Sequence, residues 1–139
     1  MILLDTNVLS ALMRREADPQ IVAWLDAQPS ESIWTTAITV FEIRFGLEIL
    51  TSGRRRRSLE DAFAKALEEE FEGRVLSFDR AAAQAAAAFA AEQRRTGRPV
   101  EIRDVQIAGI AAARNATLAT RNRRHFEGIG IGLIDPWSV

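Results

Sequence analysis

The 139-residue chain has no cysteine, which excludes disulfide bonds, cysteine-ligated zinc sites and thiol nucleophiles. It has one histidine, His125, so a histidine-rich metal site is excluded and a Ser-His-Asp arrangement would depend on one residue in an arginine-rich segment. The only lysine, Lys65, follows no glycine-rich loop, which disfavours a P-loop or a Schiff-base enzyme. The residue types that are absent or rare therefore disfavour catalysis by cysteine, histidine or lysine.

The chain also lacks long apolar runs and a strong net charge. No hydrophobic stretch is long enough to span a bilayer, and no secretion signal follows Met1, so we expect a cytoplasmic protein without membrane contact. With 18 basic and 19 acidic residues, the net charge of −1 disfavours a general polyanion binder but permits a local basic patch. A hydrophobic content of 47% suits one compact domain over residues 1–139.

Short apolar segments alternate with amphipathic ones along the chain. We expect strands near residues 1–4, 32–35, 74–78, 117–120 and 130–134. We expect helices near residues 6–13, 40–50, 54–71 and 79–96, with further helices starting near Pro19 and Asp104. This alternation predicts an α/β fold in which helices cover both faces of a central, mostly parallel sheet of four to five strands.

Three acidic residues stand near predicted strand ends or helix starts. Asp5 follows the first strand, Glu42 lies in the first turn of the predicted helix at 40–50, and Asp104 precedes an amphipathic run. Ligands of open α/β sheets bind beyond the carboxyl ends of the strands. Carboxylates gathered at that edge repel one another unless a cation lies between them. The pattern favours a hydrolase site that binds magnesium or manganese.

Each of these acids also has a purely structural interpretation. Thr39 and Glu42 match the capping box, in which the glutamate side chain accepts from the amide of the threonine. Asp104 and either Asp5 or Asn7 are acceptable N-caps for the helices that follow. Caps are commoner than active sites, so the joint placement of the three acids carries the functional hypothesis.

Two arginine clusters differ in their relation to the predicted site. The run Arg54–Arg57 opens a predicted helix and is best explained as a solvated face. Arg121, Arg123 and Arg124 follow a predicted strand end on the same edge as the acids, so they are the better candidates for contact with nucleic acid.

Four segments together resemble PIN-domain proteins of the VapC toxin group: Ile2–Val8, Thr39–Gly46, Asp104–Ala108 and Ala119–Asn122. The tail Asp135-Pro136-Trp137 and the overall spacing resemble the FitB-like branch most closely. Each motif is short, but the four occur in the order typical of the family. The resemblance covers essentially the whole chain.

The resemblance implies a three-layer α/β/α fold and a ribonuclease dependent on Mg²⁺ or Mn²⁺. By motif match, Asp5, Glu42 and Asp104 take the positions of the family's acidic residues, and Asn122 stands at the fourth. Magnesium is usually held by one or two protein carboxylates and keeps several waters, which suits direct ligation by Asp5 and Asp104 with Glu42 acting through water. The amide at position 122 removes a charge, so the number of ions stays open.

The resemblance also implies partners. These are an RNA substrate, a cognate VapB-like or FitA-like antitoxin with a DNA-binding part, operator DNA reached only through that complex, and a second copy of the chain in a homodimer. Two alternatives stay open. A haloacid-dehalogenase-type phosphatase would need an aspartate where Asn7 stands, and a weakened PIN domain that only binds partners is supported by Asn122.

Overall fold

The computed structural model describes residues 1–139. Its strands are β1 (Ile2–Leu4), β2 (Ile33–Thr36), β3 (Val75–Leu76), β4 (Thr117–Ala119) and β5 (Gly132–Ile134). Its α-helices are α1 (Thr6–Leu12), α2 (Pro19–Asp26), α3 (Ala37–Glu48), α4 (Arg54–Lys65), α5 (Arg80–Arg95) and α6 (Ile102–Ala113). Shorter helical turns are η1 (Ser30–Ser32), η2 (Ala66–Glu70) and η3 (Arg123–His125).

The strands form one sheet in the order β3-β2-β1-β4-β5, and every pairing is parallel. This confirms the predicted parallel sheet. The chain adds strands on one side of β1 as far as β3 and then crosses to the other side for β4 and β5. The carboxyl ends of β1 and β4 therefore flank the point where the strand order reverses, which is the usual ligand-binding position in open α/β sheets.

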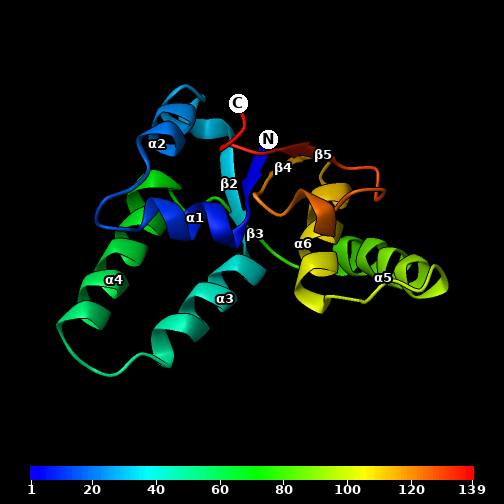
Figure 1. Ribbon diagram of the computed structural model, residues 1–139, viewed down its shortest axis with the longest axis horizontal. Helices are drawn as coiled ribbons and strands as arrows, with labels where there is room; N and C mark the ends of the chain where they lie inside the picture. The colour runs from blue at the N-terminus through cyan, green and yellow to red at the C-terminus, as the bar shows by residue number, and fades with distance from the viewer.

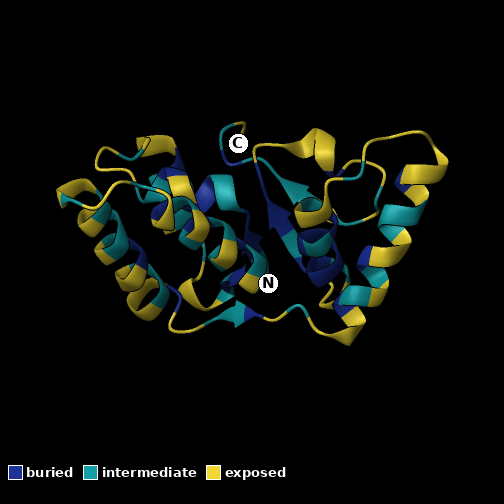
Figure 2. Ribbon diagram, turned by 90° about the horizontal axis from the view of Figure 1, so that it is seen from below, coloured by how far each residue is buried: buried dark blue, intermediate teal, exposed yellow.

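Two hydrophobic cores lie on opposite faces of the sheet, because successive side chains of a strand point to opposite sides. Leu3 of β1 packs with residues of α5 and α6, whereas Leu4 packs with residues of α1 to α4. Figure 1 shows these two helix groups on either side of the strands. Buried residues are concentrated between the groups and exposed ones on their outer surfaces (Figure 2). The arrangement is the three-layer α/β/α fold.

The alanine-rich helix α5 packs closely against α6. A Cβ atom at Gly109 of α6 would lie 2.4 Å from the carbonyl oxygen of Ala82 and 2.8 Å from the Cβ of Ala86. A glycine is therefore required for this approach between the two helices. The N-cap of α5 is Asp79, whose carboxylate accepts from the amide of Ala82 at 3.0 Å.

Several element boundaries differ from the prediction. Helix α3 begins at Ala37 rather than near residue 40, and α6 begins at Ile102, two residues before Asp104. The helix expected over residues 54–71 ends as α-helix at Lys65 and continues as the π-helical turn η2. No helix is long and apolar enough to cross a membrane.

Candidate active site

Asp5 lies directly after β1, at the point where the strand order reverses. Its Oδ1 accepts from the amide of Thr6 at 2.8 Å, and its Oδ2 accepts from the Thr120 hydroxyl at 2.7 Å and from Nδ2 of Asn7 at 3.0 Å. Asp5 is also the N-cap of α1, so the predicted cap is confirmed. The hydrogen bond from Thr120 joins the ends of β1 and β4 and fixes the carboxylate at the sheet edge.

The electrostatic surroundings of Asp5 disfavour its charged form. Burial raises the pKa of Asp5 above its ordinary value, and the hydrogen bonds from Thr120 and Thr6 oppose this rise. The nearby charges of Asp104 and Glu42 raise the pKa further. The three acids predicted from the sequence thus share one region, and a cation there would relieve the repulsion between them.

The predicted capping box of Thr39 and Glu42 is wrong. The cap of α3 is Thr36, whose hydroxyl accepts from the amide of Thr39 at 3.1 Å, so Glu42 lies beyond the first turn and cannot complete a box. Instead Oε1 of Glu42 accepts from the Thr6 hydroxyl at 2.8 Å. Because the Thr6 amide donates to Asp5, Thr6 connects the two acids. Nη1 of Arg103 lies 3.4 Å from Oε2 of Glu42, and the two side chains form an ion pair that is open to solvent.

Asp104 also differs from its predicted capping role. It lies in the first turn of α6, whose N-cap position is Glu101 and has no side-chain cap. Oδ2 of Asp104 is 2.7 Å from Nδ1 of His125. Burial raises the pKa of Asp104, and the hydrogen bond and charge of His125 act in the opposite direction. The structure therefore places the acid at the sheet edge and beside a histidine rather than at a helix cap.

Asn122 follows β4 at the start of the turn η3. Its backbone amide donates to the Thr120 hydroxyl oxygen at 3.0 Å, and that hydroxyl donates to Asp5. The side-chain amide of Asn122 forms no hydrogen bond with the three acids. The residue is thus linked to Asp5 through the backbone and Thr120, and its side chain is exposed.

Sequence reasoning missed several polar residues that contact the acids. Thr6 and Thr120 adjoin predicted strand ends, and that position is the signal that could have identified them. Arg103 and His125 reach Glu42 and Asp104 from elements that only the folded chain brings together. The sequence signal for His125 is weak, because it is one histidine among arginines, although its segment follows a predicted strand end at the same edge.

The donor set fits a magnesium or manganese ion held by few protein ligands. The three acids supply oxygen atoms, which hard cations prefer. No three acidic or histidine side chains are placed to ligate one ion together. Magnesium keeps several waters and commonly takes only one or two carboxylates, so a site of this kind does not need an all-protein cage.

Comparison with known proteins identifies relatives over the full chain. The profile of the family described as PIN domain matches residues 2–131. The chain is 43% identical to the plasmid stability protein StbB of Pseudomonas syringae pv. tomato, over 100% of both chains. It is 39% identical to VapC ribonuclease Y4jK of Sinorhizobium fredii, over 99% of this chain and 98% of that one. It is 34% identical to toxin FitB of Neisseria gonorrhoeae, over 99% of each.

Solved structures show the same fold. The crystal structure of FitAcB from Neisseria gonorrhoeae superposes with a TM-score of 0.90 at 33% identity and covers 100% of both chains. The structure of FitAB bound to an IR36 DNA fragment has the same TM-score and identity and covers 100% of this chain and 97% of that one.

Proposed function

The chain belongs to the PIN-domain family, and from this we propose that it is a metal-dependent endoribonuclease, the toxin of a type II toxin-antitoxin pair, formed by one domain over residues 1–139. Its relatives include proteins named VapC ribonuclease and toxin FitB, which support the nuclease class. An RNA substrate implies action in the cytoplasm.

The observation that carries this proposal is the position of Asp5. The residue is 4% exposed, lies where the strand order reverses, and has a pKa raised by burial and by the charges of Asp104 and Glu42. A fold has no stability reason to gather three acids there, because each charge disfavours the others. Such groups at an expected ligand-binding edge are candidates for function.

Asp5 and Asp104 would hold the ion in this proposal, with Glu42 acting through water. A bound Mg²⁺ or Mn²⁺ supplies charge neutralisation at the phosphate and activation of water for phosphodiester hydrolysis. The protein's own groups fix the acids in place. Thr120 and Thr6 donate to Asp5, and Thr6 also donates to Glu42, so neither carboxylate is free to rotate away from the edge.

Arg103 and His125 act as positioning residues in this account. Arg103 pairs with Glu42, and His125 contacts Asp104 from the turn η3. Neither residue is needed as the base that accepts the proton of water. The exposed amide of Asn122 can orient a water at the same edge, which supports its proposed place as the fourth site residue.

We also propose a protein partner. The FitAcB and FitAB neighbours support a cognate VapB-like or FitA-like antitoxin for this chain. The neighbour bound to an IR36 DNA fragment supports contact with operator DNA through that complex. The chain's own net charge of −1 favours this indirect route over direct DNA binding.

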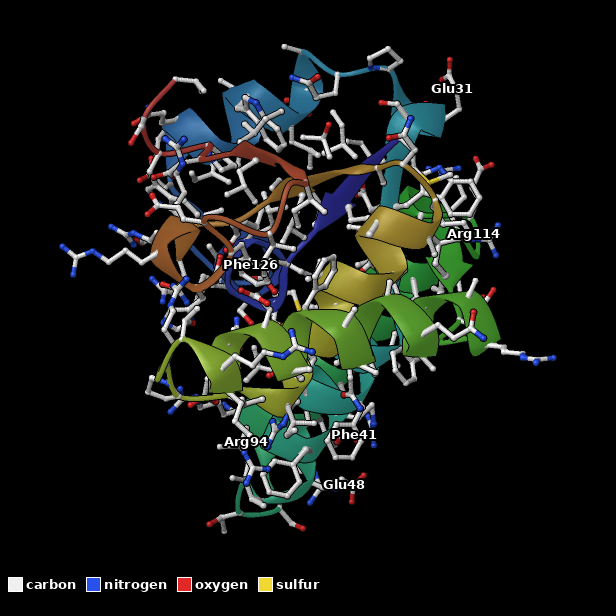
Figure 3. The ribbon with its side chains drawn as sticks, turned by 90° about the vertical axis from the view of Figure 1, so that its right-hand side faces the viewer. Glu31, Phe41, Glu48, Arg94, Arg114 and Phe126 are labelled. Carbon is white, nitrogen blue, oxygen red and sulfur yellow. The ribbon has the colours of Figure 1, made fainter.

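An exposed apolar patch on α3 and α6 supports a homodimer. It consists of Phe41, Phe45, Ile49 and Ile102, which are between 49% and 69% exposed. Phe41 and Phe45 stack with ring centroids 6.1 Å apart, and the Arg103 guanidinium lies over both. Figure 3 shows Phe41 on α3. Clustered exposed aromatics are typical of interaction surfaces.

Replacing Phe45 by aspartate is expected to convert the dimer into a monomer, because the interface would lose a buried aromatic ring and the carboxylate would have to leave water on association. Sedimentation equilibrium of both proteins measures this change. Val139→Asp is the matched control, since Val139 is 69% exposed and lies outside the patch. A wild-type protein that is monomeric at all concentrations, or a Phe45→Asp variant that stays dimeric, would refute this assignment.

Metal removal tests the nuclease proposal. Purified protein freed of any bound antitoxin is incubated with a mixed RNA pool in Mg²⁺, in Mn²⁺ and in excess chelator. We expect cleavage with either ion, none in chelator, and recovery when excess metal is returned, because no protein group replaces the ion's charge at the phosphate. Cleavage that continues in chelator would contradict the proposal.

A second candidate function rests on Asn122. Because position 122 is an amide, only three acids lie at the carboxyl edge of the sheet. This favours a PIN domain that binds an antitoxin but cleaves RNA weakly or not at all. This alternative predicts no cleavage in any metal together with a stable antitoxin complex. The chelator experiment separates the two functions.

A further inference from the structure

We propose that a polar cleft beside the candidate active site is a subsite for a nucleotide of single-stranded RNA, an inference that rests on the nuclease function proposed above. The cleft has a volume of about 720 Å³, and its lining includes Asn7, Arg14, Arg121 and Trp137. It lies between α1, the start of α2 and the C-terminal segment. A volume of this order is typical of small-ligand sites.

Asn7 connects the cleft to the acids. Its Nδ2 donates to Oδ2 of Asp5 at 3.0 Å, and its Oδ1 accepts from the backbone amide of Arg121 at 3.1 Å. The side chain of Asn7 therefore lies between the cleft and the Asp5 carboxylate and contacts both. An RNA strand with one phosphate at the acids would place a neighbouring nucleotide in the cleft.

Trp137 and Arg121 form a stacked pair at the wall of the cleft. The guanidinium carbon of Arg121 lies 4.7 Å from the centroid of the Trp137 ring. Trp137 is half-buried and packs against the core formed with α1 to α4. The tail is fixed to α2 because Nε2 of Gln20 donates to the carbonyl oxygens of Trp137 and Val139 at 3.0 and 3.3 Å. Figure 1 shows this segment returning from β5 towards α2.

This pair suits a nucleobase. Bases of single-stranded RNA stack on aromatic rings and on arginine guanidinium planes, and a ring already held by the core loses little conformational freedom on binding. Arg121 is exposed, so a base could stack on the face of its guanidinium that points away from the Trp137 ring. The Asn7 side chain accepts from the backbone amide of Arg121, and this hydrogen bond positions the Arg121 guanidinium for stacking.

The charges of the cleft suit a phosphate. Arg14 and Arg121 form no ion pair, unlike Arg44, Arg56 and Arg103 elsewhere in the chain. Two acids also line the cleft, Asp18 and Glu16. Asp18 is engaged as the cap of α2 and accepts from the amide of Gln20 at 2.9 Å, whereas Glu16 is exposed to solvent. Two unpaired arginines beside an aromatic ring match the combination of charge and stacking that binds single strands. The other large cavity has a mainly apolar lining and lacks this combination.

RNA binding, measured in chelator so that the RNA is not cleaved, tests the proposed subsite. A short fluorescein-labelled single-stranded RNA of mixed sequence is titrated with protein in excess chelator, and anisotropy is followed at several KCl concentrations. We expect Arg14→Ala and Arg121→Ala each to weaken binding about five- to tenfold, as loss of one stacking or phosphate contact does. Each should lower the slope of log affinity against log salt by roughly 0.7. Arg15→Ala loses the same charge outside the cleft and should leave affinity within about twofold.

Arg121→Lys separates stacking from charge. Lysine keeps the charge but lacks the planar guanidinium, so this variant should lose affinity while it keeps the salt slope of the wild type. Thermal melts check that these exposed substitutions leave the fold intact.

Affinities of the cleft variants equal to that of Arg15→Ala would overturn the subsite. Unchanged RNA binding together with loss of a co-expressed antitoxin would also overturn it, by assigning the cleft to a protein partner. Intact, cleft-dependent RNA binding without cleavage in metal would support the subsite and contradict only the nuclease proposal.

Discussion

Asp5→Asn is expected to lower the rate of RNA cleavage at least about 100-fold, the size of loss that follows removal of one group acting on transition-state charge. Asparagine is nearly the same size and can still accept from the Thr6 amide, so the cap of α1 survives. It loses the charge that would hold the metal ion, and the amide nitrogen that replaces Oδ2 cannot accept the hydrogen bond from Nδ2 of Asn7. Initial rates of cleavage of a labelled RNA, measured in Mg²⁺ beside the wild type, give the result.

The control for this substitution is Asp79→Asn. Asp79 also caps a helix at the sheet edge, with its carboxylate accepting from Ala82 at 3.0 Å, but it lies after β3 and away from the other acids. We expect cleavage by Asp79→Asn to match the wild type. An equal loss of cleavage in both variants would mean that Asp5 matters only as a helix cap.

The stability of Asp5→Asn should change in the direction set by the pKa. Burial raises the folded-state pKa of Asp5, so its contribution to stability is complete below about pH 4, the ordinary pKa of aspartate, and is lost as the pH rises through the folded value. Asparagine does not titrate. In chelator, the free energy of unfolding of the variant minus that of the wild type should therefore increase from about pH 4 to neutral pH. A decrease in this difference over the same pH range would contradict a raised pKa of Asp5 in the folded protein.

Glu42→Gln is the second substitution with a large expected effect. Glutamine can still accept from the Thr6 hydroxyl, so we expect the free energy of unfolding to change by less than about 1 kcal/mol. Cleavage should be abolished in the same assay, because the amide has no charge to act on the water or the ion. Thermal melts and cleavage rates of the same preparations measure both effects.

Glu48→Gln is the matched control for Glu42→Gln. Glu48 lies on the same helix and is also paired with arginine, but its side chain is more than half exposed and it makes no contact with Thr6. It should retain full activity. If Glu42→Gln instead lost folding and activity in parallel, the residue would be structural rather than part of the site.

The sheet and the position of Asp5 could be predicted because they depend on local sequence. The apolar segment Ile2–Leu4 has an acid at its end, and alternation of strands with helices favours parallel pairing. Glu42 and Asp104 are likewise predicted at that edge from their places near a strand end or a helix start. Those residues contribute to the local electrostatics of Asp5 in the folded protein.

The contacts of the acids could not be predicted in the same way. Thr36 and Thr39 are both good caps, and the choice of Thr36 moves the start of α3 by three residues and changes the partner of Glu42 from a backbone amide to Thr6. The contact between His125 and Asp104 depends on the conformation of a loop turn, and loops carry weak sequence signals. The stacking of Arg121 on Trp137 joins residues of two loops and has no periodic pattern at all.

We propose that the acids at the edge of β1 hold a metal ion for RNA cleavage. The most direct test measures the initial rate of cleavage against Mn²⁺ concentration for wild type, Asp5→Asn and Asp79→Asn. We predict saturable cleavage by wild type and Asp79→Asn, and cleavage by Asp5→Asn that is at least about 100-fold slower at concentrations that saturate the wild type. Cleavage by Asp5→Asn at the wild-type rate, or a wild-type rate independent of Mn²⁺, would contradict it.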